Sequence, residues 1–183
     1  MTVEIKEVTT LRQLKTFIKF PLSLYKANPY YVPAMYGDEL NTLRKDRNPA
    51  FEDARARYWL AYRSGKVVGR VAAMIIPKEK SKWGVNLMRF GWIDFIDDAE
   101  VVRALMDTVE AWAKEEGTDG VHGPLGFTDL DREGMLVEGF NEVTTLATIY
   151  NYPYYPKLLE ELGYTKDVDW LDHEFFVTNR SEE

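Results

Sequence analysis

The chain has 183 residues, of which 45% are hydrophobic, so it is long enough to form one domain with a sizeable buried core. Its 30 acidic residues outnumber its 23 basic ones, and the net charge of −7 argues against general binding to nucleic acid. The absence of cysteine excludes a disulfide framework and a thiolate nucleophile. With no membrane span and an N-terminus unlike a signal peptide, the sequence favours a cytoplasmic protein.

The N-terminal part of the chain predicts a strand followed by two helices. Alternating polar and apolar residues over 3–8 indicate the strand. Thr10 and Gln13 have the spacing of a capping box, so a helix is expected to begin there, and Pro21 is expected to end or kink it. Pro33 is well placed as the first residue of the second helix.

The middle of the chain predicts three antiparallel strands. Residues 57–63 and 66–76 flank a Ser-Gly turn and indicate a β-hairpin. A charged loop over 77–84 is expected to lead into a long strand over 85–96. Asp98 is placed to cap the helix that follows, whose apolar face comprises Val102, Leu105, Met106, Val109 and Trp112.

The C-terminal part predicts shorter elements. Gly117 is expected to stop the long helix, and residues 119–123 form a short candidate strand. A helix is expected between Pro156 and Gly163, and a final strand over 168–177. This order predicts one domain over residues 1–178 and a solvated tail over 179–183.

The fold class expected from this order is α/β (α+β), with a mixed, mostly antiparallel central sheet and helices on both of its faces.

The segment "GPLGFTDLDREGMLVEGF", residues 123–140, is the most unusual stretch of the sequence. It begins like a calcium-binding loop, but Phe140 stands where that loop needs a bidentate glutamate. The two histidines, His122 and His173, lack zinc-ligand spacing, and the glycines do not match a phosphate-binding motif. No Gly-x-Ser-x-Gly motif of a serine hydrolase occurs either.

Three carboxylates of this segment, Asp129, Asp131 and Glu133, support two interpretations. In the first interpretation, one of these carboxylates acts as a general base or holds a substrate amine. Alternatively, Asp129 or Thr128 caps a helical turn and the other acids lie in water. Both interpretations remain open from the sequence.

Two aromatic motifs, "NPYYVP" at 28–33 and "NYPYYP" at 151–156, also support two interpretations. They either anchor the starts of helices or line an elongated apolar substrate groove. Tyr150 and Tyr154 either supply phenol protons to a reaction or pack in the core. An edge strand or these aromatic patches could support a homodimer.

The order of elements, with "KVVGRVAAMI" at 66–75 and "YPKLLEELGYTKDVDW" at 155–170, resembles the GNAT superfamily of acyl-CoA N-acyltransferases. This resemblance implies transfer of an acyl group from acyl-CoA or acetyl-CoA, as co-substrate, to an amine of a small molecule or lipid. The stretches 20–35, 47–73 and 123–140 further resemble a bacterial subfamily of mostly unassigned substrate. Longer members of that subfamily contain two such halves, and some are linked to attaching fatty acyl groups to lipid amines.

The resemblance also implies which residues hold the co-substrate. In the superfamily, the strand that corresponds to residues 89–96 splays from its neighbour and pairs with the pantetheine arm through its backbone. The candidate cofactor-binding residues are Trp92, Ile93, Asp94, Phe95 and Asn151. Backbone amides of this strand would also polarise the thioester carbonyl.

Two features of the superfamily are missing from the sequence. The phosphate-binding loop after this strand contains no glycine, and Asp97, Asp98 and Glu100 would face the anion. Leu159 stands where the superfamily has its proton-donating tyrosine, so Tyr150 or Tyr154 would have to protonate the departing thiolate. The alternative is a non-catalytic GNAT-like module that binds a ligand or a partner and has lost the phosphate loop.

Overall fold

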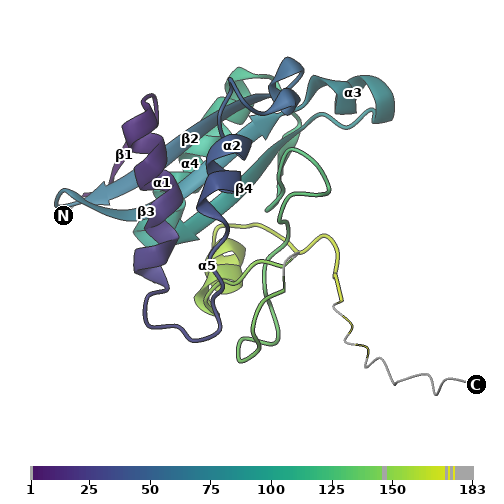
Figure 1. The fold of residues 1–183 in the computed structure, drawn as a ribbon. Coiled ribbons are helices and arrows are strands. Elements are labelled where there is room, and N and C mark those ends of the chain that lie inside the picture. The colour runs from purple at the N-terminus through teal and green to yellow at the C-terminus, as the bar shows by residue number, and fades with distance from the viewer. Residues whose placement is uncertain (1, 146–147, 172, 174, 176–183) are drawn as a thin grey trace, which may run out of the picture.

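The computed structural model describes residues 2–145, 148–171, 173 and 175, which are organised around one five-stranded sheet (Figure 1). The strands lie in chain order: β1 (Glu4–Glu7), β2 (Arg55–Arg63), β3 (Lys66–Ile75), β4 (Leu87–Phe95) and β5 (Gly120–His122). The first four strands pair antiparallel and β5 pairs parallel to β4. The sheet is therefore mixed and mostly antiparallel, as the sequence predicts.

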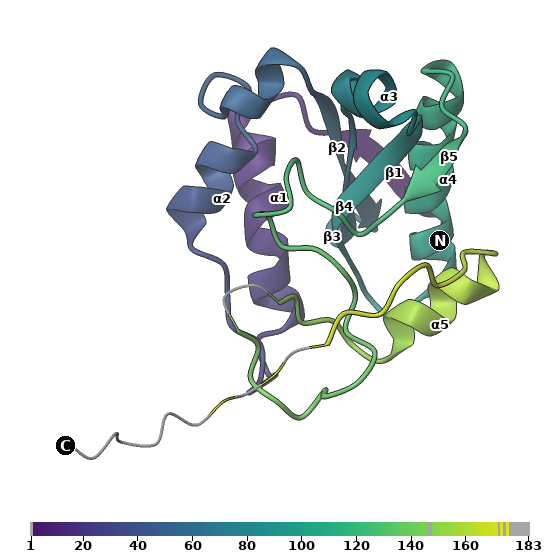
Figure 2. The ribbon, with the colours of Figure 1, turned by 90° about the vertical axis from the view of Figure 1, so that its right-hand side faces the viewer.

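Helices cover both faces of the sheet. Figure 2 shows α1 (Leu11–Leu24) and α2 (Tyr36–Thr42) on one face of the sheet, with α4 (Ala99–Glu115) toward the other. α5 (Tyr154–Glu161) packs with α4 in one cluster of buried apolar side chains, and α1 contributes to a second cluster on the opposite face. Two short helical elements, α3 (Pro77–Trp83) and the 3₁₀ helix Pro49–Glu52, complete the structure. No helix in the described part of the chain is both long and apolar enough to cross a membrane.

The beginning of α1 is confirmed, but its expected end is wrong. Thr10 accepts a hydrogen bond from the backbone N–H of Gln13, and the Gln13 side chain accepts one from the N–H of Thr10. The helix continues past Pro21 to Leu24. Because proline has no N–H, the carbonyl of Phe17 loses its helical partner, and Nη1 of Arg70 donates to it instead at 3.0 Å. A side chain from β3 thus allows the helix to pass through the proline.

Three other expectations about helices need correction. α2 begins at Tyr36 rather than Pro33. The expected charged loop at 77–84 is the helix α3, with proline in its first turn and Gly84 in the left-handed conformation at its end, which is a common way for short helices to begin and end. α5 begins at Tyr154, two residues before the predicted Pro156.

The final predicted strand, 168–177, is not observed where the structure can be described. Its described residues, 168–171, 173 and 175, are irregular, and the remainder lies outside the described residues. The predicted tail over 179–183 also lies outside them.

Candidate functional site

A bulge in β4 opposite β3 is the first structural peculiarity of the site. The register passes from the pair Ala72–Gly91 to the pair Arg70–Asp94, so Trp92 and Ile93 together face the single residue between Arg70 and Ala72. Trp92 has a φ of 44°, a left-handed conformation that costs a bulky residue about 1–2 kcal/mol. Strained backbone of this kind persists where surrounding contacts hold it, and it gathers at functional sites.

The contacts that hold Trp92 come from two different segments. Its indole Nε1 donates to Oε2 of Glu39 at 2.8 Å, and its ring centre lies 6.0 Å from that of Phe127. The side chain of Trp92 therefore connects β4 to α2 and to the 123–140 segment.

The strands β4 and β5 pair only over three residues, from Leu87–Gly120 to Arg89–His122. The chain then leaves the sheet, and the N–H of Leu125 donates to the carbonyl of Phe90 at 2.7 Å. A Cβ atom at Gly91 would lie 2.3 Å from the carbonyl oxygen of Leu125, so only glycine permits this close approach. Beyond Gly91, β4 has no neighbouring strand on its β5 side within the described part of the chain.

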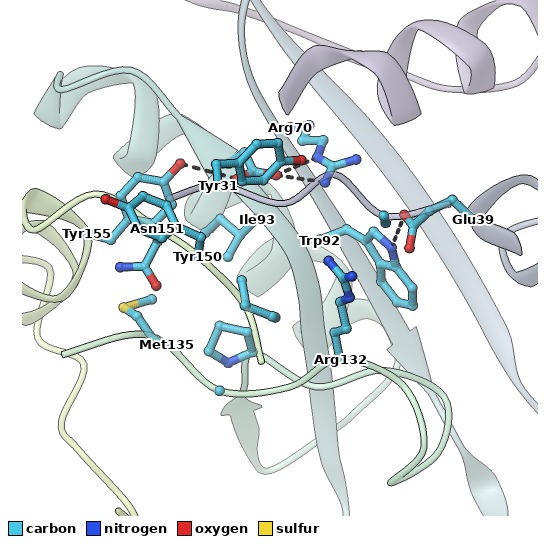
Figure 3. A pocket seen from close by; sticks show the side chains of 15 residues that line it. Tyr31, Glu39, Arg70, Trp92, Ile93, Arg132, Met135, Tyr150, Asn151 and Tyr155 are labelled. Atoms are coloured by element: carbon cyan, nitrogen blue, oxygen red, sulfur yellow. Dashed lines mark hydrogen bonds and ion pairs between the residues drawn. The ribbon is translucent and has the colours of Figure 1, made fainter. Parts of the chain in front are cut away.

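A cavity of about 70 Å³ lies beside β4 where the two strands part (Figure 3). Its walls come from β3, β4, α2 and the segment before it, the 123–140 segment and residues 149–155. Typical sites for whole ligands measure ~300–1,000 Å³, so this cavity has room for one small reacting group. Figure 3 shows Glu39, Arg132 and Trp92 at one end, and Tyr155, Asn151 and Met135 at the other.

Asp94 and Arg70 form a buried ion pair in the cavity wall. Nε and Nη2 of Arg70 both lie 2.7 Å from Oδ2 of Asp94, and both side chains are less than 10% exposed. Oδ1 of Asp94 accepts from the hydroxyl of Tyr25 at 2.8 Å and from that of Tyr155 at 3.3 Å. Burial, together with the charge of Asp94, raises the pKa of both tyrosines well above the usual value. The carboxylate therefore has partners on both oxygens and the phenols stay protonated.

Glu39 differs from Asp94 because only one of its oxygens is engaged. Oε2 accepts from Trp92, whereas Oε1 forms no hydrogen bond with any described residue. Tyr31 also lines the cavity, and burial raises the pKa of its phenol to about 12. Among the charged groups of the cavity wall, Glu39 is thus the one with a carboxylate oxygen available to a ligand.

The acidic part of the 123–140 segment forms a turn. Oδ2 of Asp131 accepts from the N–H of Phe127 at 2.8 Å and from the N–H of Thr128 at 3.0 Å. The hydroxyl of Thr128 accepts from the N–H of Leu130 at 3.3 Å. Side-chain capping, the second interpretation offered by the sequence, therefore describes Asp131 and Thr128, although Asp131 rather than Asp129 is the capping acid.

None of the three predicted carboxylates lines the cavity. Asp129 is exposed, and Glu133 is partly buried. Burial, with the nearby charge of Asp129, raises the pKa of Glu133. From the same segment, Arg132 and Gly134 do line the cavity.

The two predicted tyrosines are placed differently. Tyr150 is buried and lines the cavity, and its hydroxyl donates to the carbonyl of Phe140 at 3.0 Å and accepts from the side chain of Asn28 at 2.8 Å. Tyr154 lies outside the cavity wall, and its hydroxyl donates to the carbonyl of Phe95 at 2.6 Å. Tyr150 alone of this pair is therefore placed to meet a ligand in the cavity.

The predicted cofactor-binding residues are largely brought together. Trp92, Ile93, Asp94 and Asn151 line the cavity, whereas Phe95 does not. The N–H of Phe95 donates to Tyr155 at 3.0 Å, so both backbone groups of Phe95 are engaged by tyrosines.

The amide of Asn151 pairs with the N–H and the carbonyl of Leu136 at 2.7 and 3.0 Å, which ties the 123–140 segment to the cavity.

Glu39, Arg70 and Arg132 of the cavity wall were not predicted from the sequence, and Tyr31 was included only as part of the aromatic motif at 28–33. One signal was present: Arg70 lies between apolar residues of β3 and Asp94 between apolar residues of β4, where an unpaired charge is costly. Glu39 and Arg132 carry no pattern that marks them in the sequence.

The N-terminus of α4, where the resemblance in the sequence implies a phosphate-binding loop, is occupied by the chain itself. Oδ1 of Asp98 accepts from the N–H groups of Glu100 and Val101 at 3.0 and 3.3 Å, which confirms the predicted cap. Arg63 pairs with Asp98 and with Glu100, and its hydrogen bond holds the pKa of the Asp98 carboxyl below its usual value. The residues here do not fit a bound pyrophosphate, because a carboxylate already accepts from the amides that phosphate would need.

Comparison with solved structures identifies the class of fold. An acetyltransferase from Clostridium acetobutylicum, solved with acetyl-CoA, matches 94% of this chain and 96% of its own chain with a TM-score of 0.54 and 10% sequence identity. Such neighbours are GNAT acetyltransferases. This chain therefore has the fold of the GNAT superfamily, as the resemblance in the sequence implies.

Two curated proteins are more similar in sequence. Protein YghO of Escherichia coli is 35% identical over 158 residues, which cover 86% of this chain and 40% of that protein. The bacterial ceramide synthase of Caulobacter vibrioides is 30% identical over 167 residues, which cover 88% of this chain and 42% of that protein. The chain thus spans about two fifths of the length of these relatives. No family model matches the chain.

Proposed function

We propose that this chain transfers an acyl group from an acyl-CoA thioester to an amine of a small molecule or a lipid. The GNAT fold supports acyl transfer, and the name of the ceramide synthase relative supports a lipid amine as acceptor. The observation that carries the proposal is the cavity beside the β4 bulge, at the place where β4 and β5 part. An acyl-CoA donor also agrees with the cytoplasmic location expected from the sequence.

Glu39 is the proton acceptor in this proposal. An amine must be neutral to attack a carbonyl, and a carboxylate within reach can take its proton. Glu39 lines the cavity with an oxygen that has no partner among the described residues, and its other oxygen is fixed by Trp92. Its role replaces the one that the sequence suggests for Asp129, Asp131 or Glu133.

The backbone of the bulge would polarise the acyl carbonyl. The bulge leaves Trp92 and Ile93 out of register with β3, and both residues line the cavity. Fixed backbone dipoles in a small site stabilise developing negative charge without reorganisation. When bound, the thioester would supply the acyl group; as the new C–N bond forms, the C–S bond breaks, and the Tyr150 phenol in the same wall would protonate the departing thiolate.

Turnover of an amine by the full chain, measured with acetyl-CoA and with long-chain acyl-CoA, tests the proposal. Glu39→Gln should lower kcat by about 10²–10⁴-fold, the usual contribution of a general base. Asp129→Asn is the matched control, because Asp129 is exposed and outside the cavity wall, and its turnover should be unchanged. Full activity of Glu39→Gln would remove Glu39 from the reaction.

The occupied N-terminus of α4 favours a second candidate, a non-catalytic module that binds a ligand or partner. Calorimetry with CoA and acyl-CoA distinguishes the two candidates, since an enzyme must bind its donor and a module without a phosphate site need not. Asp98→Ser keeps a capping hydroxyl but removes the negative charge, so it should strengthen binding of a CoA donor if the phosphates approach α4. No heat of binding in either protein, together with no turnover, would support the binding module.

A further inference from the structure

The exposed face of α1 carries cations and no acid. Arg12, Lys15 and Lys19 are exposed, and the helix contains neither aspartate nor glutamate. At 100° per residue these three side chains share one face of the helix with Leu11 and Leu22, within an arc of about 100°. Leu11 and Leu22 are 48% and 46% exposed, so charged and apolar groups alternate on this face.

Among the described residues these cations have no carboxylate partner, unlike most of the arginines that the structure describes. Arg55, Arg57 and Arg63 pair with Glu116, Glu7 and Asp98, whereas none of the three cations of α1 forms an ion pair with any described residue. Leu11, Arg12, Lys15, Thr16 and Lys19 also line a shallow hollow on the surface. In a chain with a net charge of −7, this face is a local positive surface.

The positive face continues toward the cavity. Nζ of Lys19 lies 5.5 Å from the ring centre of Tyr36, the first residue of α2. Val32, Met35 and Tyr36 are 41%, 71% and 38% exposed, and they flank Ala34, which lines the cavity. Figure 1 shows α1 and α2 next to each other on the same face of the sheet.

The nearest exposed acid of this segment, Asp38, follows Tyr36 by two residues, which places it on a different side of α2.

We propose that this surface, formed by Arg12, Lys15 and Lys19 with Leu11, Leu22 and Met35, docks the protein on an anionic lipid bilayer. Cations of a helix are attracted to anionic headgroups, while exposed aliphatic side chains enter the boundary between headgroups and acyl chains. A nucleic acid or an acidic protein would use the three cations but would gain little from the exposed leucines and the methionine. A bilayer uses both kinds of side chain.

Docking through this surface brings the rim of the cavity close to the membrane. Met35 would enter the headgroup region, and its neighbour Ala34 belongs to the cavity wall. An amine carried by a lipid headgroup could then reach the cavity without leaving the bilayer. This consequence rests on the proposed function, whereas the docking itself does not.

Co-sedimentation of the full chain with vesicles tests the docking. Phosphatidylcholine vesicles that contain phosphatidylglycerol should bind the protein, pure phosphatidylcholine vesicles should bind it weakly, and binding should fall with ionic strength. The triple variant Arg12→Gln, Lys15→Gln, Lys19→Gln should lose affinity by about a hundredfold, at about fivefold per cation. Met35→Ser should weaken binding with little change in its salt dependence.

The matched control is Arg103→Gln, Lys114→Gln, Lys157→Gln, which removes the same charge from exposed positions of α4 and α5. It should bind anionic vesicles like the unmodified chain. Equal losses in both triple variants, or no binding of the unmodified chain to anionic vesicles, would overturn the proposal. Binding of the unmodified chain to polyglutamate or single-stranded DNA, without binding to vesicles, would also overturn the proposal.

Thermal melting establishes that the variants are folded, and acyl transfer to a water-soluble amine should be the same in both triple variants. Vesicle binding without any acyl transfer would therefore leave the docking intact and contradict the proposed function alone.

Discussion

Asp94 is the single acidic residue of β4, whereas Asp129, Asp131 and Glu133 follow one another within five residues. In the structure Asp94 is buried and is held by Arg70, Tyr25 and Tyr155. The three acids of the 123–140 segment separate instead: one caps a turn, one is exposed and one is partly buried.

Acidic residues that are close in sequence therefore do not by that fact share a site. Although these acids are two residues apart, only Asp131 has hydrogen-bond partners among the described residues. The cavity wall is instead built from residues far apart in the chain, such as Glu39, Asp94 and Tyr150. A charged residue in a buried strand predicts a partner of opposite charge more reliably than several acids in a loop predict a shared site.

Among the variants that test this comparison, Arg70→Met should change the free energy of unfolding most. Arg70→Met leaves the Asp94 carboxylate buried without its cation and the Phe17 carbonyl without a donor. Breaking a buried pair costs about 3–5 kcal/mol, and chemical denaturation measures it as a lower midpoint. Arg103→Met on the exposed side of α4 is the control, with an expected change within about 0.5 kcal/mol. A similar small change in Arg70→Met would mean that the ion pair is not the centre of the site.

Removal of the capping acid should have a smaller effect. Asp131→Ala leaves the N–H groups of Phe127 and Thr128 without their acceptor and should destabilise the fold by about 1–3 kcal/mol. Asp129→Ala, two residues away and exposed, should change the free energy of unfolding by less than about 0.5 kcal/mol. Equal losses in the two variants would show that the acids act as one cluster after all.

The smallest effect is expected at Glu133, where it depends on pH. Because burial raises the pKa of Glu133, the folded state binds its proton more readily than the unfolded state, so this group lowers stability as pH rises from its ordinary pKa through the raised one. Glu133→Gln removes that loss and should be more stable by less than about 1 kcal/mol at neutral pH.

Urea titrations of Glu133→Gln at neutral pH and at a pH below the ordinary glutamate pKa check this sign. The advantage of the variant should disappear at the lower pH. Glu142→Gln, at an exposed position of the same region, is the control and should show no such dependence. A variant less stable than the unmodified chain at neutral pH would indicate that Glu133 has a favourable partner.

Features that depend on neighbours a few residues apart could be predicted from the amino-acid sequence alone. The capping box of Thr10 and Gln13 and the Asp98 cap are hydrogen bonds within one helical turn. The Ser-Gly turn between β2 and β3 has a positive φ at both residues, and Gly117 follows the end of α4 with a φ of 66°. Apolar periodicity also identified the buried face of α4, because side chains three or four residues apart share one side of a helix.

Three features could not be predicted in this way: how α1 continues past Pro21, how Trp92 is held in its left-handed conformation, and where the cavity lies. Each depends on a partner far along the chain: Arg70 is 53 residues from Phe17, and Trp92 is 53 residues from Glu39. Such contacts exist only once the sheet has brought β3, β4 and α2 together. Local preferences act over one turn of helix or one pair of strands, so they cannot specify these partners.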